Sequence, residues 1–104
     1  MTDVRACSVA DVASPAHARF ELDGVPVCVV HIDDGWYAIN DTCSHEDYSL
    51  CDGELWPDDL AVECWKHGST FSLLTGEPQS LPATKPVPVY PVRIDGDAVI
   101  VTLP

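Results

Sequence analysis

One stretch in the first half of the chain decides the fold: Val25-Pro26-Val27-Cys28-Val29-Val30-His31-Ile32-Asp33-Asp34-Gly35-Trp36-Tyr37-Ala38-Ile39. It consists of two segments rich in β-branched and aromatic residues, separated by a turn that ends in Asp-Gly. Two such segments around a short turn are typical of a β-hairpin. We therefore expect strands over residues 25–32 and 36–39.

The chain on both sides of this hairpin shows the same pattern of short apolar segments between turns. We expect further strands over Leu60–Cys64 and Phe71–Leu74, and a second hairpin that joins Val89–Ile94 to Ala98–Leu103. Nine Pro and six Gly leave little room for helices, and only residues 8–12 suggest a helical turn. The pattern predicts an all-β fold, a small sandwich or barrel of short antiparallel strands.

Length and charge limit the possible functions. The chain has 104 residues, so we expect a single domain over residues 1–104 and a monomer. Five Lys and Arg face 17 Asp and Glu, which gives a net charge of −12. This charge argues against nucleic acid and anionic membranes as partners, whereas it permits a basic protein partner. The sequence shows neither a transmembrane-length apolar run nor a secretory signal pattern, which predicts a cytoplasmic protein.

Five cysteines stand at positions 7, 28, 43, 51 and 64. Because their number is odd and a cytoplasmic location is expected, we predict no disulfide framework. Cys7 and Cys28 are interpreted as core residues of strands, and Cys51 as a structural thiol. His17, in a polar connection, and His31, at a strand end, are interpreted as ordinary surface histidines.

Two short segments combine cysteine with histidine: Cys43-Ser44-His45 and Cys64-Trp65-Lys66-His67-Gly68-Ser69. Two Cys and two His can bind zinc or an iron–sulfur cluster. Structural zinc sites usually begin with a Cys pair and end with a His pair, whereas each segment here supplies one residue of each type. This arrangement suits two irons, one held by both thiolates and the other by both imidazoles, which is the Rieske ligand set.

The pattern C-x-H … C-x2-H, followed by Gly68, resembles the fingerprint of the Rieske [2Fe–2S] family. The flanking segments also resemble small soluble Rieske ferredoxins of bacteria: Ser49-Leu50, Asp52-Gly53, 63–69, 71–76 and 81–92. Within that group the chain is most similar to actinobacterial members. These are commonly labelled dioxygenase ferredoxin components and often lie beside genes for iron–sulfur cluster assembly.

The resemblance implies one Rieske-type [2Fe–2S] cluster as cofactor. By analogy with the family, Cys43 and Cys64 are expected to hold the buried iron, and His45 and His67 the outer iron. The cluster-binding portion is expected over about residues 43–86.

The resemblance also implies what surrounds the cluster. Pro82 belongs to a third segment that covers it, and Ser69 is expected to donate a hydrogen bond that raises the potential. Phe71 stands where high-potential members have a second donor, Tyr. We therefore place the potential in the lower part of the Rieske range of roughly −150 to +300 mV. Tyr48 and Lys66 occupy the positions of a loop-to-loop disulfide in respiratory members, so we expect none between these loops.

A cluster without an open coordination position predicts an electron carrier, not an enzyme. The resemblance implies transfer from a flavin-dependent ferredoxin reductase to a terminal acceptor such as a ring-hydroxylating dioxygenase. An accessory redox or binding protein of iron–sulfur cluster assembly is the main alternative. A nitrite-reductase-like subunit and a zinc-stabilised interaction domain also remain open.

The tryptophans have two interpretations. Trp65, with Lys66 beside it, either marks a docking surface next to the predicted His ligands or packs on the neighbouring loop. Trp36 and Trp56 are interpreted as core or loop anchors. The acidic pairs at 33–34 and 58–59 are expected to be solvated turns.

Overall fold

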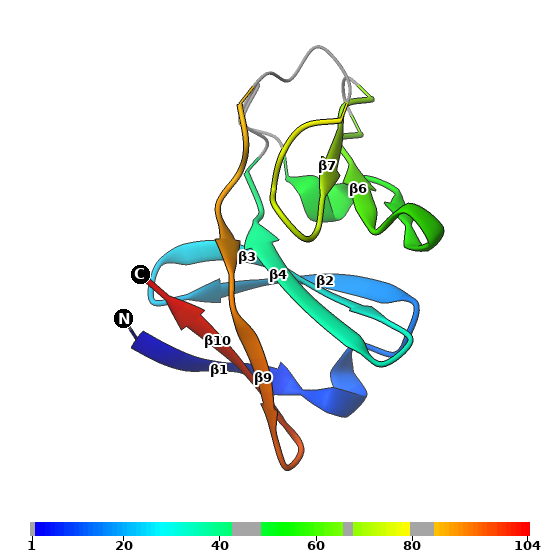
Figure 1. Cartoon of the computed structure of the whole chain (residues 1–104). Helices are drawn as coiled ribbons and strands as arrows, with labels where there is room; N and C mark the ends of the chain where they lie inside the picture. The colour runs from blue at the N-terminus through cyan, green and yellow to red at the C-terminus, as the bar shows by residue number, and fades with distance from the viewer. Residues whose placement is uncertain (1, 43–48, 66–67, 80–84) are drawn as a thin grey trace.

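The computed structural model describes residues 2–42, 49–65, 68–79 and 85–104 (Figure 1). Its strands are β1 (Thr2–Ser8), β2 (Ala16–Leu22), β3 (Val25–Ile32), β4 (Gly35–Asn40), β5 (Leu55–Trp56), β6 (Ala61–Glu63), β7 (Thr70–Ser72), β8 (Val89–Tyr90), β9 (Val92–Asp95) and β10 (Ala98–Leu103). Three short 3-10 helices, η1 (Val9–Asp11), η2 (Leu50–Asp52) and η3 (Pro57–Asp59), connect them. The described residues include no helix long and apolar enough to cross a membrane. The all-β prediction is confirmed.

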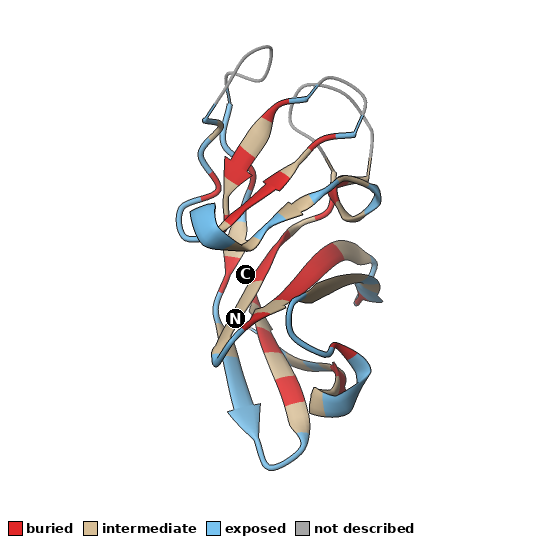
Figure 2. Ribbon diagram, turned by 90° about the vertical axis from the view of Figure 1, so that its right-hand side faces the viewer, coloured by how far each residue is buried: buried red, intermediate tan, exposed pale blue. Residues whose placement is uncertain are grey.

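The strands form three antiparallel sheets, in the orders β1-β10-β9, β2-β3-β4-β8 and β5-β6-β7. The β5–β7 sheet lies at one end of the molecule, and both chain termini lie together beside β1 and β10 (Figure 1). Buried residues alternate with less buried ones along several strands, as in strands that cover a core on one face (Figure 2).

The β2-β3-β4-β8 sheet has a hydrophobic core on each face. Along β3, Val27 and Val29 belong to one core, whereas Cys28, Val30 and Ile32 belong to the other. Successive side chains of a strand point to opposite faces, so a strand covered on both faces needs apolar residues in sequence. This explains the nearly continuous apolar run that identified the hairpin.

One core joins this sheet to β1 and β10. Alternate residues of β10, Val99, Val101 and Leu103, are buried there with Cys7 of β1. β1 pairs with β10 along its length, with an irregularity between Arg5 and Cys7. The sequence interpretation did not predict β1, because its polar composition shows no strong strand pattern.

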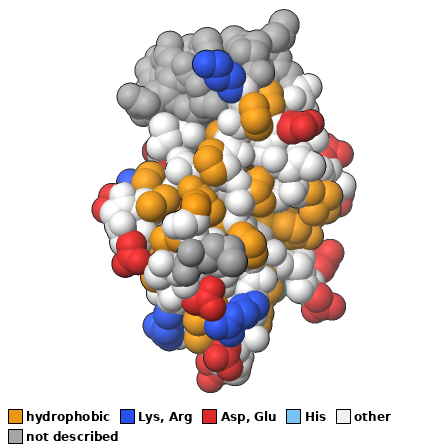
Figure 3. Space-filling view, turned by 60° about the vertical axis from the view of Figure 1, so that its left-hand side comes forward, with side chains coloured by type: hydrophobic (Ala, Val, Ile, Leu, Met, Phe, Trp, Pro, Cys, Tyr) orange, Lys and Arg blue, Asp and Glu red, His pale blue; other side chains and the backbone are white. Residues whose placement is uncertain are grey.

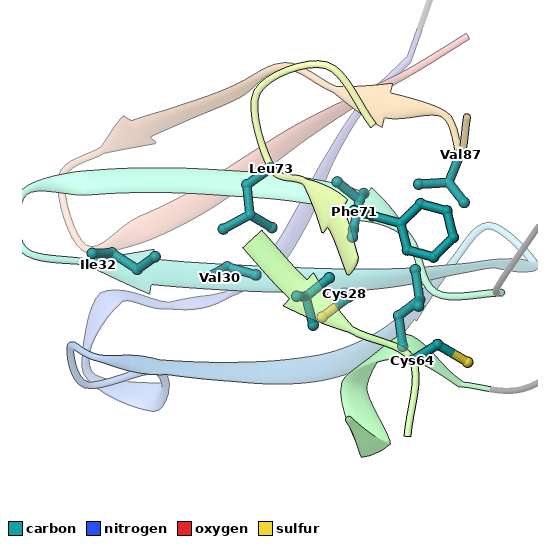
Figure 4. Packing of buried hydrophobic residues seen from close by; sticks show 10 residues of the cluster. Cys28, Val30, Ile32, Cys64, Phe71, Leu73 and Val87 are labelled. Carbon is teal, nitrogen blue, oxygen red and sulfur yellow. The ribbon is translucent and has the colours of Figure 1, made fainter. Parts of the chain in front are cut away.

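The second core joins β3 and β4 to the β5–β7 sheet (Figure 4). Phe71 of β7 and Val62 of β6 are fully buried in it, together with Leu50 of η2. Cys64, just after β6, belongs to the same core. The packing thus places a predicted cluster ligand at the edge of a rigid apolar layer.

Most expected strands are present, with shifted ends. The central hairpin, the C-terminal hairpin and a helical turn near residues 8–12 are confirmed. The strand expected over 89–94 is divided at Pro91: β8 pairs with β4, and β9 pairs with β10. Proline has no N–H to donate to a ladder, and here its carbonyl accepts from Thr102 N at 2.9 Å. The apolar run 89–94 therefore contributes one strand to the β2-β3-β4-β8 sheet and one to the β1-β10-β9 sheet.

Gly76 joins the turn after β7 to the segment that leads to β8. Its N–H donates to Ser72 O and its carbonyl accepts from Val87 N, both at 2.8 Å. Its φ is +76°, and a Cβ atom would clash with the Val87 carbonyl oxygen and lie 2.9 Å from Val89 Cγ2. The position therefore requires glycine for two reasons, conformation and close approach.

Gly76→Ala is expected to destabilise the protein by roughly 3 kcal/mol, since strain at positive φ adds to steric overlap. Gly24→Ala is the matched control, because Gly24 has φ +81° but nothing within 4 Å of an added Cβ. It should cost only about 1 kcal/mol. Thermal unfolding of the cluster-loaded protein at one scan rate measures both. Equal midpoints for the two variants would contradict the close approach at Gly76.

Candidate functional site

The structure describes only part of the predicted ligand set. Cys64 is fully buried immediately after β6. Cys43, His45 and His67 lie outside the described residues, as does Pro82. The described chain on either side of these residues shows how the segments that carry them are anchored.

The segment that carries His67 begins and ends in a tight turn. Cys64 N donates to Ser69 O at 2.7 Å, and Gly68 N donates to Cys64 O at 2.9 Å. Gly68 adopts φ +75°, in the left-handed region that favours glycine. Ser69 is fully buried. The turn fixes the Cys64 backbone at the start of the segment that carries both predicted ligands.

The segment that carries Cys43 and His45 is closed at its base. Thr42 and Ser49 form an isolated antiparallel bridge, so the two ends of residues 43–48 lie side by side. Asn40 Oδ1 accepts a hydrogen bond from Thr42 N at 2.9 Å. β4 ends at Asn40, shortly before this segment, and η2 begins at Leu50, shortly after it.

A buried carboxylate, Asp41, organises this base. It is 2% exposed, and its side chain accepts three hydrogen bonds: from Arg19 Nε at 2.9 Å, Ser49 Oγ at 2.6 Å and Cys51 N at 2.9 Å. Its backbone carbonyl also accepts from Leu50 N at 2.6 Å. Asp41, which precedes residues 43–48, therefore binds all three residues that follow them, Ser49, Leu50 and Cys51.

Arg19 supplies the counter-charge for Asp41. Its guanidinium also bonds Glu21 at 3.0 Å, on the exposed side of β2. Hydrogen bonds that the guanidinium donates to Glu21 and Asp41 raise the pKa of Arg19 above its ordinary value, although burial opposes the shift. A buried carboxylate with a cation and two further donors has the partners that burial demands.

The two predicted loops start and end close together because Gly53 allows the backbones to meet. A Cβ at Gly53 would clash with the Glu63 carbonyl oxygen and lie 3.1 Å from Trp65 N. Glu63 N donates to Glu54 O at 2.8 Å beside it. The exit of the first loop thus packs against the entrance of the second, around Cys64.

The three tryptophans differ in exposure. Trp65, which was expected either to mark a docking surface or to pack on the neighbouring loop, is 50% exposed beside Cys64. Trp56 is 41% exposed, so it is not a core residue. Trp36 is half-buried and stacks on His31, with ring centroids 3.9 Å apart. The acidic pairs at 33–34 and 58–59 are exposed, as predicted.

The prediction that the chain has no disulfide is wrong. Cys28 of β3 is bonded to Cys51 of η2, with their Cα atoms 5.8 Å apart. A count of cysteines cannot reveal this pair, because the fold brings together residues 23 positions apart. Cys7 is buried and free, and burial raises the pKa of its thiol, so it behaves as the core residue that was predicted.

The two histidines outside the motif are not ordinary surface residues. His17 lies within β2, not in a polar connection, and its Nε2 is 3.2 Å from Gly53 O. Among the described residues, His17, Cys28 and Cys51 are grouped with their donor atoms within 4.8 Å of one another. His31 Nδ1 lies 2.8 Å from Val12 O. Sequence reasoning missed these contacts because they cross between elements.

Comparison with known proteins matches residues 2–91 to the model of the Rieske [2Fe-2S] domain. The chain belongs to the Rieske [2Fe–2S] family. It is 41% identical over 105 residues to the 3-phenylpropionate/cinnamic acid dioxygenase ferredoxin subunit of Escherichia coli (strain K12), covering 100% of this chain and 96% of that one.

Solved structures give the same assignment. The ferredoxin of carbazole 1,9a-dioxygenase from Nocardioides aromaticivorans IC177 superposes with a TM-score of 0.93 at 35% identity, covering 97% of each chain. A chain in a complex of reduced oxygenase and oxidized ferredoxin of carbazole 1,9a-dioxygenase gives a TM-score of 0.87 at 34% identity, covering 95% of this chain and 91% of that one. The predicted Rieske ferredoxin fold is confirmed.

A Rieske domain carries one [2Fe–2S] cluster, and the described residues fit it. Cys64 offers a buried thiol at the end of β6, where a thiolate ligand is shielded from water. The bridge between Thr42 and Ser49 and the close approach at Gly53 bring the bases of both Cys/His segments together. The donor set of two Cys and two His matches a Rieske centre.

Asp41→Asn is expected to destabilise the folded protein by roughly 2 kcal/mol and to accelerate cluster loss. The amide loses the charge that pairs with Arg19 and cannot accept all three hydrogen bonds. Arg19 is 44% exposed, so the cost stays below that of a fully buried pair. Bleaching of the visible cluster absorbance during heating measures the effect.

Glu21→Gln is the matched control, because Glu21 bonds the same guanidinium from a position that is 63% exposed. A surface pair of this kind contributes less than about 1 kcal/mol. If both variants lost their cluster at the wild-type rate, Asp41 would not organise the loop base.

Proposed function

We propose that the protein is a one-electron carrier of a multicomponent ring-hydroxylating dioxygenase. It would receive electrons from a flavin-dependent ferredoxin reductase and deliver them to the terminal oxygenase. Full-length similarity to a dioxygenase ferredoxin subunit carries this proposal. The structural neighbour in complex with an oxygenase supports the second step. We place this function in a single domain over residues 1–104 and in the cytoplasm.

We assign the cluster ligands residue by residue. Cys43 and Cys64 would hold the inner iron, and His45 and His67 the outer iron, where the imidazoles face a partner. When bound, the cluster takes up and releases one electron at a time. The buried side chains around Cys64 exclude water from its sulfur, and the half-exposed Trp65 beside it supports a docking surface at this end.

The surface charge supports fast and weak docking with a basic partner. The chain has a net charge of −12. Figure 3 shows one face of the molecule, on which hydrophobic side chains gather near the middle and acidic side chains lie around the edges. Complementary charge raises the rate of encounter more than the strength of binding. An electron carrier needs this combination, since it must leave each partner quickly.

The function is tested by reconstitution with a flavin-dependent ferredoxin reductase and a ring-hydroxylating oxygenase. The loaded protein should show the rhombic electron paramagnetic resonance signal of a reduced Rieske centre and should support product formation. Cys64→Ser should support none, because its cluster is lost. Reduction of the cluster without any product would overturn the dioxygenase role. Transfer of the intact cluster to an apo-protein would favour the alternative role in cluster assembly.

Varying the salt concentration distinguishes the docking of a protein partner from the reduction of the cluster itself. Reduction by a basic reductase should slow as ionic strength rises, because screening weakens attraction to the acidic surface. Reduction by dithionite should instead become faster, because salt screens the repulsion between this small anion and the acidic protein. The same salt dependence with both reductants would contradict electrostatic steering.

Ser69→Ala is expected to lower the midpoint potential. In the proposed arrangement the buried Ser69 donates to the cluster, and the more negative reduced state gains most from that bond. A difference of about 1.4 kcal/mol between the two states corresponds to about 59 mV for one electron. Protein-film voltammetry measures the shift. Ser72→Ala, at the end of β7, removes a hydroxyl that accepts hydrogen bonds from Leu74 N and Thr75 N in the following turn, and it should leave the potential unchanged.

A further inference from the structure

The bonded pair Cys28–Cys51 lies outside the predicted ligand set and joins two different parts of the fold. Cys28 stands in the middle of β3, fully buried, and pairs with Arg19 of β2 and Ile39 of β4. Cys51 lies on η2 and is half-buried. The bond therefore connects a central strand of the β2-β3-β4-β8 sheet to a short 3-10 helix.

The disulfide attaches to the chain shortly after residues 43–48, because Cys51 lies in η2. Ser49 pairs with Thr42 across the base of residues 43–48, and η2 begins at the next residue. Cys51 is thus the first covalent anchor after the segment that carries Cys43 and His45. A cross-link here fixes the exit of that segment to the central sheet.

His17 lies beside the bonded cysteines, with its donor atom within 4.8 Å of both sulfurs. Its Nε2 lies 3.2 Å from Gly53 O, so this ring contacts the backbone that follows η2. Since the two sulfurs are bonded to each other, the arrangement favours thiol–disulfide chemistry over a metal site.

We propose that Cys28 and Cys51 form a second redox site, a reversible two-electron thiol–disulfide couple whose oxidised form fastens the base of the first cluster loop. The effect on the cluster rests on the ligand assignment proposed above, whereas the couple itself does not. The site would react with hydrogen peroxide as oxidant and with a dithiol as reductant. Cys51 is the sulfur that a reagent reaches first, because Cys28 is fully buried.

The reaction balances in both directions. Two thiols and one hydrogen peroxide give one disulfide and two waters: the S–S bond forms, the O–O bond breaks, and the peroxide takes both electrons and both protons. A dithiol reverses the step by exchange, becoming a disulfide itself while Cys28 and Cys51 regain their protons.

The noncovalent contacts of η2 make reversal plausible without unfolding. Asp41 Oδ1 accepts from Cys51 N at 2.9 Å, and Asp41 O accepts from Leu50 N at 2.6 Å. These bonds do not involve the sulfurs, so they hold η2 beside β3 in the reduced protein too. The two thiols stay within reach of each other and can be oxidised again.

The couple is tested on the loaded protein by differential alkylation. The protein is equilibrated with dithiothreitol, or with hydrogen peroxide after removal of the reductant, then denatured in acid, alkylated with a maleimide and mapped by mass spectrometry of its peptides. We expect Cys28 and Cys51 to be alkylated together after dithiothreitol and protected together after peroxide. A second round of dithiothreitol should restore both adducts. Cys51→Ser should leave Cys28 open to alkylation after either treatment.

Three results would overturn the couple. Alkylation of both residues after peroxide would show that no disulfide forms, and protection of both after dithiothreitol would show that it is not reversible. Zinc bound to the reduced protein in equal amount, and lost in Cys51→Ser, would make the group a metal site. Cys7→Ala is the control, because Cys7 is buried in a strand without a sulfur partner and alanine adds no buried hydroxyl, so this variant should behave as wild type.

The effect on the loop is measured as the rate of cluster loss in a chelator. The disulfide form should lose its visible absorbance several-fold more slowly than the dithiol form. The two treatments should give equal rates in Cys51→Ser and in Cys28→Ala, a second variant that avoids a buried hydroxyl. Equal rates in the wild type would overturn the fastening role. Electron delivery to an oxygenase is assayed separately, so failure there would count against the proposed function alone.

Discussion

The burial of the Asp41 carboxylate is the constraint on which the rest of the site depends. A buried charge is costly unless cations and donors surround it, so Arg19, Ser49 and the Cys51 backbone must all lie where they do. This condition can be met only if the chain returns to its starting point after residues 43–48. The carboxylate thus fixes Ser49 and Cys51, on the far side of these residues, close to Asp41 before any cluster is bound.

Packing applies a second constraint, from the opposite side of the site. The central sheet is covered on both faces, and the core between β3 and the β5–β7 sheet contains both Leu50 and Cys64. The close backbone approach at Gly53 then leaves the two loop bases little freedom to separate. A chain of 104 residues can bury only a modest core, so it benefits from placing that core directly beneath its functional loops.

The sequence predicted what local patterns encode. Hairpins follow from apolar runs around Asp-Gly turns, and the spacing of Cys and His leads to the ligand set that we propose. It did not predict that Pro91 divides one strand between two sheets, nor that Cys28 meets Cys51. Both depend on which elements become neighbours. The role of Asp41 was missed for the same reason, since an acidic residue before a motif shows no sign of burial.

These observations explain why one short element, η2, carries so many restraints. The ligands that we propose after Thr42 need a fixed base, because electron transfer without large rearrangement requires ligands that stay in place in both oxidation states. Hydrogen bonds to Asp41 restrain η2 through its backbone, the apolar core restrains it through Leu50, and the disulfide restrains it through Cys51. Only the last of these can be made and broken by redox chemistry. The fold therefore holds η2 by packing and polar contacts, and the cysteine pair adds a restraint that depends on the redox state of the surroundings.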